Sequence, residues 1–262
     1  MRPALWIGLA ALIVGPAGVA PQDGPRAEAS VHQAPKFLAG EARAAFLNQV
    51  SKKMGELRSV AATFDQEKHL ALFKEPLRSR GQVLFGAPDH LRWEFLEPFR
   101  SVLIVSGDQV AKFEQKGAAW RKLDQGRQAE VILVVMDNIR SWFRGKFDTP
   151  RERGREPAFE VLVAEEPKRL IIMRPRDLLL SRTLREVELA LSADGAHVER
   201  VTIREVSGDK TVMKFAHAKR EPGDTLDKRF FSLKEVVEVR VAELRTSSAK
   251  TSTPPTEGGG TR

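Results

Sequence analysis

The sequence of 262 residues contains no cysteine. The chain therefore forms no disulfide, and it has no thiol to which a lipid anchor could be attached. It also lacks a long apolar segment, because its most apolar run, residues 5–14, is too short to span a membrane. We expect a fold whose stability depends on its hydrophobic core alone.

Signals of enzymatic chemistry are absent as well. There is no Gly-x-Ser-x-Gly motif, no glycine-rich phosphate loop and no cysteine nucleophile. The carboxylates occur in polar surroundings, and the pairs Glu67 with His69 and Arg92 with Glu94 fit exposed positions on strands. The histidines show no metal-ligand spacing: His32, His69, His90, His197 and His217. The sequence therefore predicts no catalytic residue, no metal site and no cofactor.

The charge balance is basic, with a formal net charge of +8. Such a balance suits nucleic acid, an anionic membrane surface or an acidic protein. No basic run is interleaved with aromatic residues, which argues against nucleic acid as a partner. Scattered Lys and Arg residues on the solvated face of a sheet are the simplest interpretation.

The first twenty residues have the pattern of a secretory signal peptide. Arg2 precedes the apolar run, and Gly18-Val19-Ala20 places small residues before a cleavage site near Ala20. Residues 21–36 then form a polar, Pro-rich linker, and residues 246–262 form a low-complexity tail. Residues 37–245 remain for a single domain of an exported protein, which we expect to be a monomer.

The periodicity of apolar residues changes twice along this domain. Residues 41–57 and 129–143 have helical spacing, and the second of these segments is apolar nearly all round. Short apolar segments separated by Gly, Pro and Asp fill the rest and predict strands. The predicted strands are 61–73, 78–85, 90–96, 101–106, 110–115, 119–123, 158–164, 169–173, 184–192, 198–206 and 211–218.

Tight turns between consecutive strands favour antiparallel pairing. The sequence thus predicts an α+β fold with a large curved antiparallel sheet of about eleven strands and helices on one face. We expect Phe230-Phe231-Ser232-Leu233 and residues 236–244 to close the sheet. The space between the sheet and the helices is either an apolar pocket suited to an acyl chain or a filled core, and composition alone favours the core.

Four motifs follow one another between Phe64 and Asp108. Phe64-Asp65-Gln66 fits Phe-x-Gln, and residues 76–85 contain Pro-Leu-x-Ser-x-Gly. Residues 88–94 fit Pro-x-x-φ-x-Trp, where φ is an apolar residue, and residues 104–108 end in a Ser-Gly-Asp turn. In this order the motifs resemble those of the periplasmic lipoprotein carrier family, LolA and its relatives.

The resemblance implies an unclosed β-barrel with a helical lid over an apolar cavity that takes acyl chains. It implies a non-enzymatic periplasmic carrier that takes an acylated lipoprotein or another envelope lipid from a membrane-bound donor to a membrane-bound acceptor. A carrier of a glycolipid, and a sensor or interaction module of the cell envelope, remain alternatives. Two features differ from the family pattern: Gly86-Ala87-Pro88 lacks the basic residue thought to hold the lid shut, and Lys112 and Glu114 replace aromatic residues.

Under this resemblance, two groups of candidate site residues follow. Leu91, Trp93 and Phe95 share one face of their strand, which we expect to line the cavity. The candidate cavity and lid residues are Phe64, Trp93, Phe95, Leu103, Val105, Met136 and Trp142. The candidate residues for partner docking are cations near the cavity mouth: Arg78, Arg80, Arg140 and Arg144.

Overall fold

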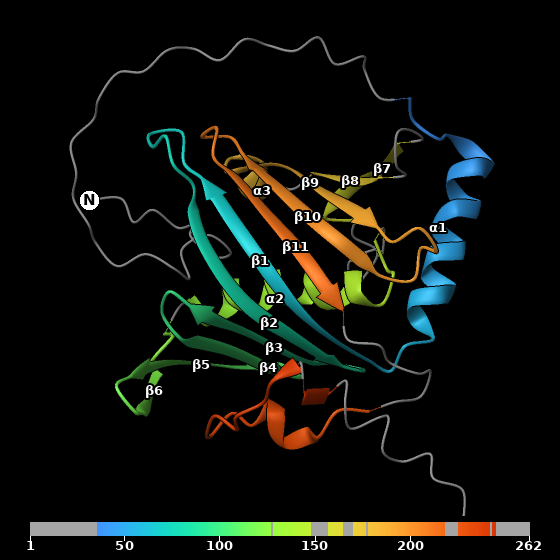
Figure 1. The fold of residues 1–262 in the computed structure, drawn as a ribbon. Coiled ribbons are helices and arrows are strands. Elements are labelled where there is room, and N and C mark those ends of the chain that lie inside the picture. The colour runs from blue at the N-terminus through green and yellow to red at the C-terminus, as the bar shows by residue number, and fades with distance from the viewer. Residues whose placement is uncertain are drawn as a thin grey trace, which may run out of the picture.

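The computed structural model describes residues 36–126, 128–147, 157–164, 170–176, 178–217, 225–241 and 243–244. The predicted signal peptide and tail lie outside the described residues, as does the predicted linker apart from Lys36. The described part of the chain spans the predicted domain. It contains a curved sheet with helices against it (Figure 1).

Eleven strands form one antiparallel sheet, as predicted. Six precede the helix at Gln128–Phe143, and five follow it. In chain order they are β1 (Ser59–His69), β2 (Leu77–Gly86), β3 (His90–Glu97), β4 (Ser101–Ser106), β5 (Gln109–Lys116), β6 (Ala119–Leu123), β7 (Phe159–Ala164), β8 (Leu170–Pro175), β9 (Leu184–Leu191), β10 (Val198–Glu205) and β11 (Lys210–His217).

The two groups of strands join through the first and last strands. β1 pairs with β11 in a register that places Phe64 opposite Phe215. The sheet order is therefore β6-β5-β4-β3-β2-β1-β11-β10-β9-β8-β7, and the two edge strands of the described sheet, β6 and β7, do not pair with each other. The prediction of an unclosed β-barrel is confirmed.

The two predicted helices are also confirmed. α1 (Gly40–Gly55) buries Phe46, Leu47, Val50 and Met54, whose spacing places them on one face. α2 (Gln128–Phe143) packs against the same face of the sheet, where Met136, Ile139 and Phe143 join the main core. A one-turn helix, α3 (Leu178–Ser181), and a 3₁₀ helix, η1 (Lys228–Phe231), were not predicted.

The C-terminal end of α2 is fixed against α1. The amides of Gly145 and Lys146 donate to the carbonyls of Trp142 and Ser141, which is the pattern of a Schellman motif. Gly145 has a φ of +69°, and a Cβ there would lie 2.7 Å from the Ser51 Cα. Only glycine therefore fits this close contact between the two helices.

The prediction that the C-terminal segment closes the sheet is wrong. None of the described residues between 225 and 244 adds a strand to the sheet. Instead, Phe231, Val239 and Val241 pack on the convex face of the sheet with Leu84 and Phe113, in a second apolar cluster. We call residues 225–241 the C-terminal strap; Figure 1 shows it beside β3 and β4.

A buried charge network attaches the strap to the sheet. Arg92 and Glu94, which the sequence placed at the surface, have no exposed side-chain area and form an ion pair of 2.7 Å. Arg92 also donates to the carbonyls of Phe230 and Val237, at 3.2 and 2.7 Å. Gln82 donates to the Val239 carbonyl and to Glu94, and it accepts from the Val241 amide. Side chains of the sheet thus satisfy several backbone groups of the strap that a paired strand would have bonded.

We predict that Arg92→Met lowers the free energy of unfolding by about 3–5 kcal/mol, because it breaks the buried pair with Glu94 and removes the donor to two strap carbonyls, while Glu94 keeps the partly exposed Arg100 as a cationic partner. Urea unfolding measures this loss. Arg80→Met is the matched control, since Arg80 pairs with Asp65 at 3.0 Å on the solvent-exposed surface, and its midpoint should hardly change. Equal unfolding curves for the two variants would contradict the role given to the buried network.

Candidate ligand-binding site

The concave face of the sheet carries a cluster of aromatic side chains. Phe64 lies at its centre, with ring centroids 5.0 Å from Trp93, 5.4 Å from Phe95 and 6.0 Å from Phe215. Phe64 and Phe215 are cross-strand partners, whereas Trp93 and Phe95 come from β3, two strands away. The cluster thus spans the junction between the two groups of strands, β1–β6 and β7–β11.

The glycine of the Pro-Leu-x-Ser-x-Gly motif makes room for this cluster. Gly81 is the β2 partner of Phe64. A Cβ at Gly81 would lie 2.4 Å from the Phe64 ring and 2.3 Å from the Glu94 carbonyl oxygen. Because real side chains do not tolerate such contacts, glycine at this position lets the Phe64 ring pack against the backbone of β2.

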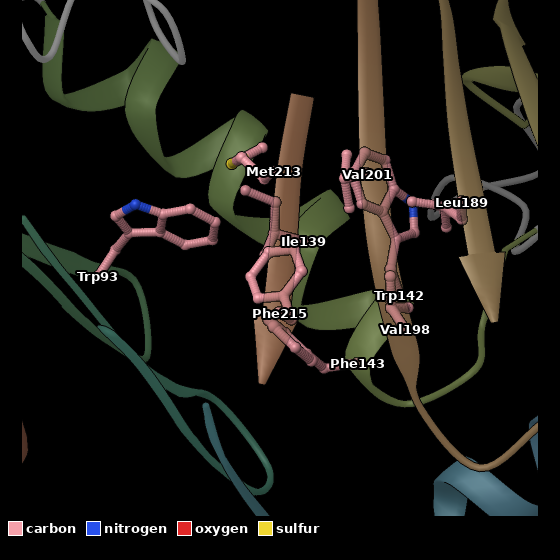
Figure 2. A pocket seen from close by; sticks show the side chains of 9 residues that line it. All are labelled: Trp93, Ile139, Trp142, Phe143, Leu189, Val198, Val201, Met213 and Phe215. Atoms are coloured by element: carbon pink, nitrogen blue, oxygen red, sulfur yellow. The ribbon is translucent and has the colours of Figure 1, made fainter. Parts of the chain in front are cut away.

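Between α2 and the concave face lies a pocket with apolar and aromatic walls. Figure 2 shows side chains of the helix and of the sheet meeting around it. α2 contributes Ile139, Trp142 and Phe143, and β3 contributes Trp93. The strands β9, β10 and β11 contribute Leu189, Val198, Val201, Met213 and Phe215.

The pocket is nearly filled in this structure. The room left among the lining side chains is ≈30 Å³, enough for about two water molecules. Pockets that hold a small molecule are usually of about 300 Å³ or more. α2 therefore lies close against the sheet, with little room between the two for a small molecule.

One arginine of α2 attaches the helix to two turns of the sheet. Arg140 is buried and donates to the carbonyl of Asp89, at 2.5 Å, and to that of Gly107, at 3.0 Å. Asp137, one turn earlier in α2, accepts from the same guanidinium. Asp89 and Gly107 lie in the β2–β3 and β4–β5 turns. This arrangement contradicts the prediction that Arg140 is available for docking a partner.

The other three candidate docking residues lie elsewhere. Arg78 and Arg80 are exposed on β2 and form ion pairs with Glu67 and Asp65. Arg144 follows α2 and is half-buried. A docking role for these three residues remains a prediction.

The predicted cavity residues fall into two groups. Trp93 and Trp142 line the pocket. The remaining five belong to the buried core of the concave face without lining the pocket: Phe64, Phe95, Leu103, Val105 and Met136. The sequence interpretation missed the lining residues of β9, β10 and β11, whose only signal is the alternation of apolar residues along those strands.

One end of the concave face is polar. The register places Gln66 opposite both Ser79 and Met213, so these side chains share the face of Phe64. Gln66, Ser79 and Thr211 are buried, and the Ser79 hydroxyl has no hydrogen-bond partner among the described residues. Beside them, Lys68 lies 4.0 Å from Glu205; burial raises the pKa of the Glu205 carboxyl, and the Lys68 charge opposes this change.

The described residues contain neither a metal-binding cluster nor a membrane-spanning helix. No group of three or more His, Asp or Glu residues there could hold a metal ion. No helix there has the length and apolar character needed to cross a membrane.

Comparisons with solved structures give low scores. The LolA superfamily protein NE2245 of Nitrosomonas europaea is 10% identical, with a TM-score of 0.33, over 71% of this chain and 97% of that chain. The lipoprotein LppX of Mycobacterium tuberculosis is 11% identical, with a TM-score of 0.36, over 66% and 94% of the two chains. The MucA/MucB complex of Pseudomonas aeruginosa gives 12% identity and a TM-score of 0.34, over 74% and 63%. At these scores the likenesses carry no argument.

The family assignment rests on the sequence. No curated protein matches the chain. The family described as "Outer membrane lipoprotein carrier protein LolA" matches residues 55–234, which include all eleven strands, α2 and η1. The chain therefore belongs to the LolA family of outer membrane lipoprotein carrier proteins.

Proposed function

We propose that the protein is a non-enzymatic periplasmic carrier that holds the acyl chains of lipoproteins between α2 and the concave face of the sheet and shuttles them towards the outer membrane. The observation that carries the proposal is the apolar pocket between α2 and the sheet. All nine of its lining side chains are apolar or aromatic. Family membership supports the same reading.

Binding in such a site needs no specific polar contact. Each buried methylene contributes about 0.8 kcal/mol, so a long acyl chain can bind tightly through burial alone. The contacts that α2 loses with the sheet are replaced by contacts with the chain, which is equally apolar. Displacement of the helix therefore costs less than exposure of the same side chains to water would.

The hydrogen bonds of Arg140 stabilise the closed position of α2, because they have to break before the helix can leave the sheet. Gly86-Ala87-Pro88 lacks the basic residue that the family resemblance led us to expect on the sheet side. In this chain the cation comes from the lid, and its acceptors are carbonyls of the sheet turns. Arg140 would hold α2 closed when the carrier is empty, and membrane-bound donor and acceptor proteins would open it during transfer.

The polar end of the concave face favours a second candidate, a carrier of another envelope lipid or glycolipid. Gln66, Ser79 and Thr211 offer both donors and acceptors, and Lys68 is balanced by Glu205. A neutral headgroup rich in hydroxyls fits this arrangement better than a phosphate does. Mass spectrometry of the lipids that co-purify with the protein from its own periplasm distinguishes the two candidates.

We predict that a palmitoylated peptide shifts the tryptophan emission of the mature protein, because Trp93 and Trp142 both line the pocket. Replacement of both residues by Phe should remove most of the shift. Trp120→Phe is the matched control, since Trp120 packs against the convex cluster and bonds to Glu238. No shift in the wild type, together with no co-purifying lipid, would contradict the carrier proposal.

We predict that Arg140→Gln speeds the uptake of a fluorescent fatty acyl probe, because it removes charge-assisted hydrogen bonds that are made only in the closed position. A gain of about fivefold to tenfold in the stopped-flow uptake rate corresponds to a loss of about 1–1.4 kcal/mol of closed-state stabilisation. Arg78→Gln removes the same charge from the exposed surface and serves as the control. An unchanged uptake rate in Arg140→Gln would show that opening does not break these bonds.

A further inference from the structure

The exposed apolar side chains gather at one end of the sheet. In the antiparallel register, this end carries the β1–β2, β3–β4 and β10–β11 turns and the β8–β9 connection with α3. Seven large apolar side chains are exposed in the described parts of the chain, and six of them lie there: Leu72, Phe73, Leu77, Phe99, Leu178 and Val206. The seventh, Phe37, bridges to Ala164 at the opposite end. We call residues 70–77, 98–100, 178–183 and 206–209 the rim.

Hydrogen bonds connect three of the four loops of the rim. The Ala71 amide donates to the Asp209 carboxylate at 2.9 Å, which links the β1–β2 turn to the β10–β11 turn. The Val206 amide donates to the Thr183 carbonyl at 2.8 Å, which links the β10–β11 turn to the segment after α3. Figure 1 shows the two turns projecting side by side, with α3 next to them. The tips of these three loops thus belong to one continuous edge.

The apolar side chains of the rim are highly exposed, and they are grouped rather than scattered over the surface. The side chain of Leu72 is 83% exposed, and that of Leu178 is 78% exposed. Each has another apolar residue close by in the sequence, Phe73 and Leu180 respectively. Exposed apolar patches of this kind mark interaction sites. Here the side chains project from convex turns, a shape that enters a deformable apolar layer more readily than it matches the surface of a rigid partner.

Exposed cations accompany the apolar tips. Lys74 follows Phe73 directly, and Arg176 and Arg182 flank α3. Cations beside inserted apolar side chains lie at the depth of lipid phosphates, where each contributes about 1 kcal/mol on an anionic membrane. Their sign is complementary to anionic headgroups.

We propose that the rim is a membrane-contact surface, which docks the protein on an anionic bilayer with Leu72, Phe73 and Leu178 inserted among the lipids. This goes beyond the proposed carrier function, because docking needs no cargo. The polar residues Gln66, Ser79 and Thr211 lie at the rim end of the concave face. The polar head of a bound amphiphile would therefore sit at the depth of the lipid headgroups while the carrier is docked.

The test is flotation of the full mature chain with vesicles of phosphatidylcholine and phosphatidylglycerol at roughly 7:3. The wild type should float with the vesicles. Leu72→Ser/Phe73→Ser and Leu178→Ser should each lower the partition coefficient by about tenfold or more, because they remove buried apolar area without changing charge. Lys74→Gln/Arg182→Gln should weaken binding to these vesicles and leave binding to pure phosphatidylcholine unchanged.

Phe37→Ser is the matched control, since it removes an exposed apolar residue from the opposite end. A wild type that stays unbound, or rim variants that float as well as Phe37→Ser does, would overturn the proposal. If the wild type does not bind vesicles but captures an envelope protein through the same residues, the membrane proposal is wrong and the rim binds a protein partner instead. Uptake of the acyl probe is measured in parallel, so that vesicle binding without uptake counts against the carrier function and leaves the rim proposal standing.

Discussion

The packing of α2 on the concave face is the interaction on which the candidate site depends. A sheet with two apolar faces needs a cover on each, and the two covers of this sheet are held differently. The strap on the convex face is attached through the buried pair Arg92 and Glu94 and through hydrogen bonds to its backbone. The helix on the concave face is held by apolar side chains and by a few polar contacts near its C-terminal end, chiefly those of Arg140.

This difference decides which face can open. Displacement of the strap would break the hydrogen bonds that Arg92 and Gln82 make to its backbone and would expose the apolar side chains of the convex cluster, with no ligand to replace these contacts. Displacement of α2 exchanges one apolar contact for another as long as an acyl chain takes its place, and the polar contacts that it breaks among the described residues are chiefly those of Arg140. In the proposed function, the convex side of this fold therefore stays covered and the concave side admits the ligand.

The sequence predicted the strands and both long helices because turn residues and apolar spacing are local signals. The motifs between Phe64 and Asp108 also include Trp93, one of the residues that line the pocket. Three features depend on contacts that are distant in sequence, and they were missed or misread. Alternating Arg92 and Glu94 look solvated until the strap covers them, the apolar spacing in residues 236–241 resembles that of a strand, and nothing local shows that Arg140 reaches Asp89 and Gly107.

The central claim is that an acyl chain lies between α2 and the concave face. Photocrosslinking with a fatty acyl probe that carries a diazirine near the end of its chain, followed by peptide mapping, tests this claim most directly. The account predicts crosslinks to Trp93, Ile139, Trp142 and Phe215, which come from both walls of the pocket. Crosslinks confined to the convex cluster around Leu84 and Phe113, or to the exposed tips at Leu72 and Leu178, would contradict it.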